Sequence, residues 1–256
     1  MNWSRPRSPS ALVSNPMQTY RTVLVNKIPF PNGVDLLRFS LQTPSSIVFF
    51  PGQYIILKVP SGVSFVNRLY SIASSSTQTG SFELLIKRIP GGLASNYINS
   101  FAVGQSVEFS GPAGQFSLKN TPQTKVFLTT GTGIAPVRSF ILSNRGHIQK
   151  HILFWGMPSV ADLYLFDELK SVAIDDPLFT FFICLSKETS LDKIDPAGRS
   201  YFRPGHINDA VKELVGSPSH NGLEFYICGR REVVESLREF LYSHNIDRSL
   251  IFFERY

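Results

Sequence analysis

Glycines and hydroxyl residues meet at one point of the chain in a pattern suited to phosphate binding. Residues 129–136 read TTGTGIAP and lie between a strand-like run and a helix-like run. Glycines let the backbone approach a pyrophosphate, and a helix start offers unpaired N–H groups. Pro136 fits an early helical position, where no amide donor is needed. The third glycine of the G-x-G-x-x-G fingerprint is missing, so a purely structural turn is an equal alternative for this segment alone.

Three further segments carry side chains that suit cofactor chemistry. Residues 68–74 read RLYSIAS and offer a guanidinium for phosphate, a phenol ring for stacking and hydroxyl groups for hydrogen bonds. Residues 92–95 read GLAS and open a short helix, where a plain helix cap is the alternative. Cys228-Gly229 ends a strand-like run, and residues 254–256 read ERY. A cysteine at a strand end is more often buried packing, which is how we interpret Cys184.

In this combination the sequence resembles the ferredoxin–NADP reductase family of flavoenzymes. The resemblance runs in order from about residue 20 to 256 and includes Pro51-Gly52-Gln53-Tyr54 and Gly111-Pro112-Ala113-Gly114. It implies an FAD-dependent NAD(P)H oxidoreductase, a flavoprotein for electron transfer. Reduced nicotinamide would deliver a hydride to FAD, and the flavin would pass electrons singly to a carrier, or the sequence would run backwards.

The resemblance also implies a role for each quoted residue. On the flavin side, Arg68 would hold the FAD diphosphate, Tyr70 would cover one face of the isoalloxazine, and Ser71 would hydrogen-bond near its reactive nitrogen. The cofactor-binding residues that it implies are Arg68, Leu69, Tyr70, Ser71, Gly92, Leu93, Ala94, Ser95, Thr130, Gly131, Thr132, Gly133, Pro136, Ser186, Lys187, Tyr201, Cys228, Gly229 and Tyr256. The catalytic residues that it implies are Ser71, Cys228, Glu254 and Tyr256.

The residues that the resemblance places near the nicotinamide lie close to the end of the sequence. Cys228 matches a cysteine that the family places beside the nicotinamide. Glu254 matches a carboxylate that the family places near the nicotinamide and near Ser71. Tyr256 matches an aromatic residue that covers the other face of the flavin. An incidental terminal aromatic is the alternative for Tyr256.

The choice between NADPH and NADH depends on a loop after a strand-like run. Ser186, Lys187 and Tyr201 resemble residues that hold the adenosine 2′-phosphate and adenine in plant-type members. A phosphate needs cations and hydroxyls, whereas an NADH site commonly has an acid for the ribose. Lys187 stands where arginine is usual and Glu188 follows it, so we expect NADPH and leave NADH possible.

Short strand-like runs separated by turn residues fill the first half of the chain. They cover residues 20–26, 34–41, 53–59, 69–74, 82–88 and 106–110, with one helix-like segment at 94–101. This pattern is typical of a small antiparallel barrel. With the resemblance it predicts a six-stranded FAD-binding β-barrel domain over residues 17–119.

The second half alternates strand and helix patterns. Strand-like runs cover 125–129, 152–155, 179–185, 224–228 and 249–253, and helix-like runs cover 135–144, 161–172, 207–215 and 231–244. Apolar strands in β-α alternation favour a parallel sheet with helices on both faces. We therefore expect a five-stranded NAD(P)-binding α/β domain over residues 120–256, with ligands outside the carboxyl ends of its strands.

Charge and the numbers of cysteine and histidine residues limit the kinds of partner and cofactor to expect. Residues 1–119 contain ten Lys and Arg against three acids, a net charge of +7, whereas residues 120–256 carry −1. This favours an acidic protein partner for the first half, and no basic run suggests nucleic acid. Two cysteines exclude a four-cysteine cluster within this chain, and scattered histidines predict no metal site. The absence of an apolar run near about 18 residues predicts no membrane span.

These observations leave three functions open. The first is a reductase that serves ferredoxin or flavodoxin, the second a reductase component for a partner oxygenase or other redox complex, and the third a nucleotide- or flavin-binding regulator without turnover. We expect a cytoplasmic monomer with a mobile tail over residues 1–16. A targeting peptide is the alternative for the tail, although it has no apolar core.

Overall fold

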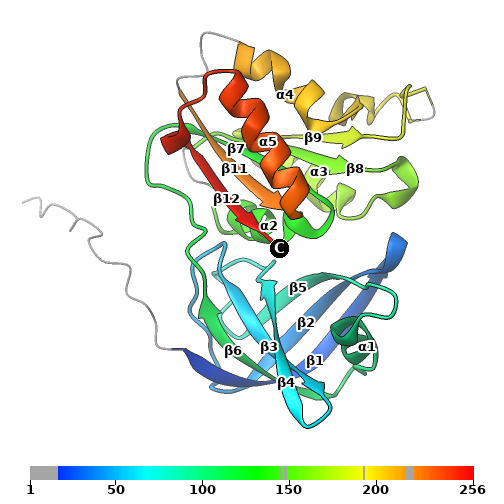
Figure 1. The fold of residues 1–256 in the computed structure, drawn as a ribbon, viewed down its shortest axis with the longest axis vertical. Coiled ribbons are helices and arrows are strands. Elements are labelled where there is room, and N and C mark those ends of the chain that lie inside the picture. The colour runs from blue at the N-terminus through cyan, green and yellow to red at the C-terminus, as the bar shows by residue number, and fades with distance from the viewer. Residues whose placement is uncertain (1–16, 145, 147–148, 193, 217–221) are drawn as a thin grey trace, which may run out of the picture.

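The computed structural model describes residues 17–144, 146, 149–192, 194–216 and 222–256. An antiparallel sheet and a parallel sheet follow each other along the chain, and the C-terminus lies where the two meet (Figure 1). The tail expected at residues 1–16 lies outside the described residues. Among those described, no helix is both long and apolar enough to cross a bilayer.

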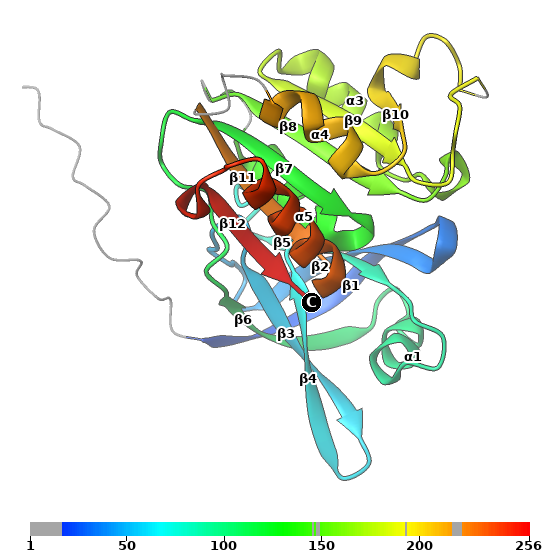
Figure 2. The same cartoon turned by 45° about the horizontal axis from the view of Figure 1, so that its top comes forward.

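The first sheet is the predicted barrel of six antiparallel strands. Its strands are β1 (Gln18–Phe30), β2 (Val34–Thr43), β3 (Tyr54–Ser61), β4 (Ser64–Ser71), β5 (Ser81–Lys87) and β6 (Ser106–Ala113). They run in the order β4-β3-β6-β1-β2-β5, and a bridge between Ile72 and Leu84 brings its two edges together. Inward side chains such as Phe39, Phe82 and Phe109 fill the core. Helix α1 (Leu93–Asn99) lies beside the barrel (Figure 2).

The second sheet is parallel, as predicted, but it has six strands where five were expected. Its strands are β7 (Thr124–Thr130), β8 (His151–Met157), β9 (Phe179–Leu185), β10 (Phe202–Pro204), β11 (Leu223–Gly229) and β12 (Ile251–Arg255). They lie in the order β10-β9-β8-β7-β11-β12. The additional strand β10 pairs with β9 over three residues, one of them proline. A strand of three residues is too short to show an alternating pattern, so no strand could be predicted there.

Four helices cover the two faces of the parallel sheet. Helices α2 (Ile134–Ser143) and α3 (Phe166–Asp175) pack on one face, and α4 (Ile207–Gly216) and α5 (Arg231–Ser243) on the other. The helix expected over 161–172 is broken. A 3-10 turn spans Val160–Asp162, and α3 begins after Leu165, which has φ 58°. A bulky residue with positive φ cannot continue a helix.

A buried polar network holds the segment between the sheets. The Lys125 Nζ lies 2.6 Å from Glu224 Oε2, and both side chains are almost fully buried. The Thr121 and Tyr226 hydroxyls also donate to this carboxylate, and the Lys119 N–H donates to Tyr226. Burial alone would raise the pKa of Glu224, but these hydrogen bonds outweigh it and lower the pKa. Glu224 therefore stays ionised, and the network ties the segment to β7 and β11.

Arg138 of α2 joins the two halves. Its guanidinium is 5% exposed and donates to the Ala73 carbonyl and to Glu83 Oε2, each at 2.8 Å. On its other side it forms two bonds of 2.6 and 2.7 Å to Glu168 of α3. Because Ala73 follows β4 by two residues and Glu83 lies on β5, this arginine positions one end of the barrel against α2.

Candidate functional site

The carboxyl ends of three neighbouring strands form the centre of the site. In the register of the parallel sheet, Cys228 of β11 lies between Thr129 of β7 and Glu254 of β12. Parallel sheets bind ligands outside these ends. The residues quoted from three distant parts of the sequence therefore reach one edge of the sheet.

The glycine turn after β7 has the close approach that its sequence suggests. A Cβ at Gly133 would lie 2.5 Å from the Cys228 carbonyl oxygen and 2.6 Å from Thr129 Oγ1, distances that side chains do not adopt. Thr129 Oγ1 donates to the same carbonyl at 2.8 Å. Gly131 has φ 51°, and nothing lies within 4 Å of the position a Cβ would take. The turn is thus tightly packed against the sheet at Gly133 and has free space at Gly131, where a pyrophosphate could approach the backbone.

Trp155 of β8 supports this turn from below. Its ring is fully buried, and its Nε1 donates to the Gly131 carbonyl at 3.0 Å. Pro136 is buried in the first turn of α2, where its missing N–H breaks no helical bond. Trp155 lies in the sequence as one of many apolar strand residues, so nothing in the pattern marked it as part of the site.

Ser71 and Glu254 connect the barrel to the end of the parallel sheet. The Ser71 hydroxyl donates to Glu254 Oε2 at 3.3 Å across 183 residues of sequence. Burial raises the pKa of Glu254 to about 7, although the bond from Ser71 opposes the rise. Glu254 can therefore hold or release a proton near neutral pH at the junction of the two halves.

Cys228 is a neutral thiol. It is 1% exposed, and burial together with the charge of Glu254 raises its pKa well above the ordinary value. This excludes thiolate chemistry near neutral pH and leaves a small, polarisable contact surface. Cys184 is also buried, with a pKa raised by burial to about 12, and it packs in the core on the α4–α5 face.

Tyr256 lies beside the end of β11, which carries Cys228 and Gly229. Its N–H donates to the Gly229 carbonyl at 3.3 Å. Burial raises the pKa of its hydroxyl, and the Thr132 side chain opposes the rise. The residue is nevertheless 60% exposed. Its backbone contact thus holds it at the junction.

The remaining flavin-side residues lie on the barrel. Among the described residues, β4 pairs along its length with β3, and its other edge is joined to β5 only near Ile72. Arg68 and Leu69 are exposed on this open edge, and Tyr70 is half-buried against the barrel core. An unpaired strand edge with a guanidinium and a phenol on one face fits a flavin nucleotide that covers it.

The start of α1 offers backbone rather than side-chain groups. Gly92 is the cap residue and provides no side-chain bond to the helix. The Ser95 hydroxyl accepts from the Ile89 N–H at 2.7 Å and so closes the loop that leads into α1. The amides of Leu93 and Ala94 belong to the free first turn, where FAD phosphates would bind.

The residues expected to hold the adenosine phosphate lie further along the same sheet edge. Ser186 and Lys187 are exposed directly after β9, two strands or about 10 Å from the glycine turn. Tyr201 stacks on Phe181 at 4.7 Å with an interplanar angle of 17°. One face of its ring is therefore already covered and is not available to an adenine.

Besides Trp155, two further residues near the junction, Arg138 and Tyr164, were not singled out in the sequence. Arg138 and Ser139 are the two polar residues in an otherwise apolar run from 134 to 142, and a cation in such a run is the signal that could have marked Arg138. Tyr164 fell within the helix expected over 161–172. Four consecutive apolar residues at 163–166 break helical periodicity there. Among the described residues, no group of three His, Cys, Asp or Glu side chains is placed to hold a metal.

Comparison with known proteins agrees with this arrangement. The family description "Oxidoreductase FAD-binding domain" matches residues 21–118, and "Oxidoreductase NAD-binding domain" matches residues 127–239. A propane 2-monooxygenase reductase component from Rhodococcus jostii is 29% identical over 94% of this chain and 64% of its own length. Ferredoxin–NADP reductase B from Sorangium cellulosum is 27% identical over 93% of this chain and 98% of its own length.

A solved reductase structure is also similar to this chain. The crystal structure of the Amycolatopsis cytochrome P450 reductase GcoB superposes with a TM-score of 0.82 and 26% identity, over 97% of this chain and 73% of that one. The chain spans about two thirds of the propane monooxygenase component and nearly all of the ferredoxin–NADP reductase. With its FAD-binding and NAD(P)-binding halves, this chain belongs to the ferredoxin–NADP reductase family of oxidoreductases.

Proposed function

We propose that this protein moves electrons between NADPH and a one-electron carrier protein, such as ferredoxin or flavodoxin, through FAD. The hydrogen bond between Ser71 and Glu254 carries the proposal. It joins the strand that would hold the flavin to the strand end that would hold the nicotinamide. The matched family ranges support a division near residue 119 into an FAD-binding domain (17–119) and an NAD(P)-binding domain (120–256).

The chain's own groups position the two cofactors. When bound, FAD accepts an electron pair from a nicotinamide and releases electrons one at a time. Arg68 and the start of α1 hold its phosphates, and Tyr70 supports its ring. The turn at Gly131–Gly133 binds the dinucleotide pyrophosphate, Cys228 contacts the nicotinamide, and Tyr256 shields the junction from water.

Glu254 and Ser71 act at this junction as a pair. The Ser71 hydroxyl donates to the carboxylate, and the raised pKa of Glu254 lets that carboxyl hold a proton near neutral pH. The pair thus controls the charge beside the reacting rings.

The charges of the barrel support an acidic acceptor. Each barrel acid is already paired with an arginine: Asp35 with Arg88, Glu83 with Arg138 and Glu108 with Arg21. The cations left over on the barrel therefore dominate its field, and such a field steers a partner of opposite sign. The two cysteines of this sequence cannot form a four-cysteine iron–sulfur cluster.

Reduction of a ferredoxin tests this function. The protein is mixed anaerobically with NADPH and an acidic plant-type ferredoxin, or with a flavodoxin, while NaCl is raised from 20 to 300 mM, roughly a fourfold reduction in screening length. We expect carrier reduction to slow severalfold as salt rises. Reduction that is independent of salt would contradict steering, and cofactor binding without turnover on any carrier would indicate a regulator instead.

The preference for NADPH gives a second test. We expect Lys187→Ala to lower the ratio of kcat/KM for NADPH over NADH by about tenfold, because the exposed ammonium no longer meets the 2′-phosphate. Lys212→Ala, which removes an exposed lysine from α4, is the matched control and should leave the ratio unchanged. An unchanged ratio in Lys187→Ala would remove the assignment of Ser186, Lys187 and Tyr201 to that phosphate.

A second candidate is an NAD(P)H-dependent reductase component of a multi-protein oxygenase. The similarity to the propane 2-monooxygenase and toluate 1,2-dioxygenase components favours it. The acceptor discriminates the two, since faster turnover with an oxygenase than with ferredoxin or flavodoxin would select this candidate. A cytoplasmic location and a monomeric state remain predictions.

A further inference from the structure

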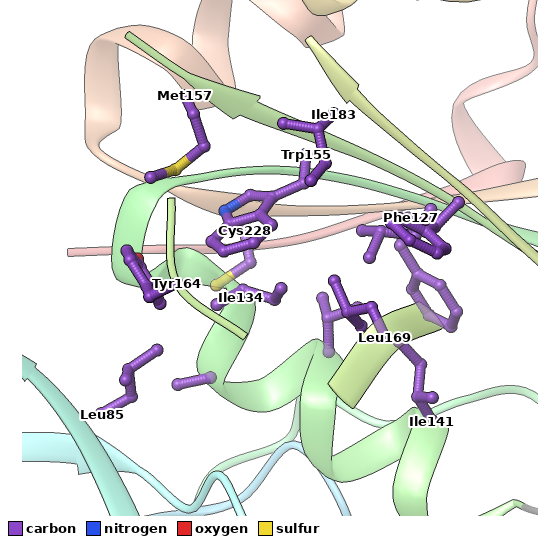
Figure 3. Close-up of a cluster of buried hydrophobic side chains, with 14 of the residues drawn as sticks. Leu85, Phe127, Ile134, Ile141, Trp155, Met157, Tyr164, Leu169, Ile183 and Cys228 are labelled. Atoms are coloured by element: carbon purple, nitrogen blue, oxygen red, sulfur yellow. The ribbon is translucent and has the colours of Figure 1, made fainter. Parts of the chain in front are cut away.

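The indole of Trp155 brings a polar N–H into an apolar cluster. The residue is fully buried, and Figure 3 shows it in one cluster with Cys228 and Ile134. A buried indole N–H costs stability unless it finds an acceptor, and here the acceptor is the Gly131 carbonyl at 3.0 Å. A wholly apolar side chain would fill the same space without this requirement. The tryptophan therefore ties the core to the glycine turn in a way that packing alone does not demand.

The neighbours of the indole fix its position. Tyr164 meets the ring edge-on with the ring centroids 4.9 Å apart, and Tyr164 in turn stacks on Phe30 of β1 at 5.4 Å. The pairing of β8 with β7 sets Trp155 opposite Thr129, two residues before Gly131. Side chains packed in this way hold one rotamer. The N–H therefore comes from a fixed ring and holds the Gly131 carbonyl in one direction.

The direction of the Gly131 carbonyl determines where the next amide points. The carbonyl also accepts from the Ile134 N–H, so its acceptor capacity is used within the protein. The Gly131–Thr132 peptide is trans, and in a trans peptide the C=O and the following N–H point in opposite directions. The Thr132 N–H must therefore point away from Trp155 and Ile134, out of the core.

This amide belongs to the start of a helix. The turn Gly131–Gly133 runs directly into α2, and the first amides of a helix have no acceptor farther back within it. Gly131 has φ 51°, and nothing lies within 4 Å of the place that a Cβ would take there. A phosphate oxygen can therefore approach the backbone at this point and accept from the Thr132 N–H.

We propose that Trp155 is a positioning residue for the pyrophosphate of the bound dinucleotide. Its indole N–H holds the Gly131 carbonyl inward and so presents the Thr132 N–H to a phosphate oxygen. This inference rests on the proposed function and adds to it the residue that orients the turn. NADPH and NADH both carry the pyrophosphate, so Trp155 contributes affinity for both and does not discriminate between them. Lys187, in contrast, is assigned to the 2′-phosphate, which NADH lacks.

The test replaces Trp155 by phenylalanine, which keeps an aromatic ring in the core and removes the N–H. The FAD-loaded Trp155→Phe protein is titrated with NADP⁺ and, separately, with adenosine 2′-monophosphate, which has no pyrophosphate. We expect the Kd for NADP⁺ to rise about fivefold, the size of effect for one hydrogen bond. The Kd for the monophosphate should not change.

Steady-state kinetics with ferricyanide as the electron acceptor give a second readout. In Trp155→Phe the KM values for NADPH and NADH should rise by the same factor at unchanged kcat, because the lost interaction binds ground state and transition state alike. The ratio of kcat/KM for NADPH over NADH should therefore keep its wild-type value. This is the reverse of Lys187→Ala, which is expected to change that ratio.

Tyr226→Phe is the matched control for the loss of a buried aromatic donor. Its hydroxyl donates to Glu224 and accepts from the Lys119 N–H, near the start of β11 and far from the glycine turn along that strand. We expect this variant to lose Tm and to keep the wild-type Kd for NADP⁺. Trp155→Phe should lose Tm as well, because phenylalanine fills less volume, so the comparison of ligands decides the test.

A second variant covers the case in which Trp155→Phe does not fold. Incorporation of 3-benzothienylalanine at position 155 keeps the bicyclic shape and replaces the N–H by sulfur. The same rise in the Kd for NADP⁺, with unchanged binding of adenosine 2′-monophosphate, is expected for this protein.

Three results would overturn the inference. They are an unchanged Kd for NADP⁺ in the variant without the N–H, equal weakening of NADP⁺ and adenosine 2′-monophosphate, and a changed ratio of kcat/KM for the two nucleotides. The wild-type protein is titrated first with NADP⁺ and NAD⁺, and failure to bind either would overturn the proposed function together with this role. Wild-type binding followed by unchanged binding in the variant would overturn the role of Trp155 alone.

Discussion

Replacing Arg138 by methionine is expected to lower the free energy of unfolding by about 3 kcal/mol. The guanidinium is 5% exposed, and its removal leaves the carboxylates of Glu83 and Glu168 beside a thioether. The Ala73 carbonyl loses a donor as well. This loss of unfolding free energy is at the low end of the range for breaking a buried ion pair, because the Glu168 side chain is 32% exposed and stays partly hydrated.

Urea unfolding measures this loss, and Arg21→Met is the matched control. Arg21 pairs with Glu108 at 3.8 Å, but both side chains are about two thirds exposed. Its loss should therefore cost less than about 1 kcal/mol. Equal unfolding free energies in the two variants would mean that Arg138 does not hold the barrel against α2.

Flavin reduction by NADPH is expected to slow by about 100-fold in Ser71→Ala, the size of effect seen when one positioned donor is lost at a reacting centre. Without this hydroxyl, Glu254 loses the hydrogen bond at 3.3 Å that fixes its carboxylate at the junction. FAD should stay bound, because the residues assigned to its phosphates are untouched. Anaerobic stopped-flow absorbance gives the rate, and the flavin spectrum before mixing gives the FAD content.

Cys228→Ala should also slow reduction while FAD stays bound, since it removes the thiol that we propose contacts the nicotinamide. Matched controls exist for both variants. Ser64→Ala changes a hydroxyl at the far end of the same strand, where it donates to Ser61. Cys184→Ala changes the other buried thiol, in the core on the α4–α5 face. Wild-type reduction rates in Ser71→Ala or Cys228→Ala would remove that residue from the reaction.

The two-part architecture could be predicted because its signals are local. Alternating apolar residues separated by turn residues predicted six barrel strands, and apolar strands alternating with helices predicted the parallel sheet. The structure confirms both arrangements. The missed strand β10 has three residues and includes a proline, so it exists through its pairing with β9 rather than through its own pattern. The break at Leu165 was missed because no residue preference predicts leucine at a positive φ.

The site could be predicted only in part. Glycine spacing and strand ends mark Gly131, Gly133 and Cys228 without a structure. The contact of Ser71 with Glu254 depends on how two sheets pack, which no local pattern encodes. The same holds for Arg138, whose partners come from β5, α3 and the end of β4.

The most direct test of the central claim is the visible spectrum of the purified protein, repeated anaerobically with stoichiometric NADPH and, separately, with NADH. We expect a flavin spectrum that bleaches with either nucleotide, and that bleaches faster with NADPH. Bleaching with NADH alone would keep the family and contradict the NADPH assignment, moving the function toward an oxygenase reductase. A colourless protein that takes up no added FAD would contradict the account as a whole.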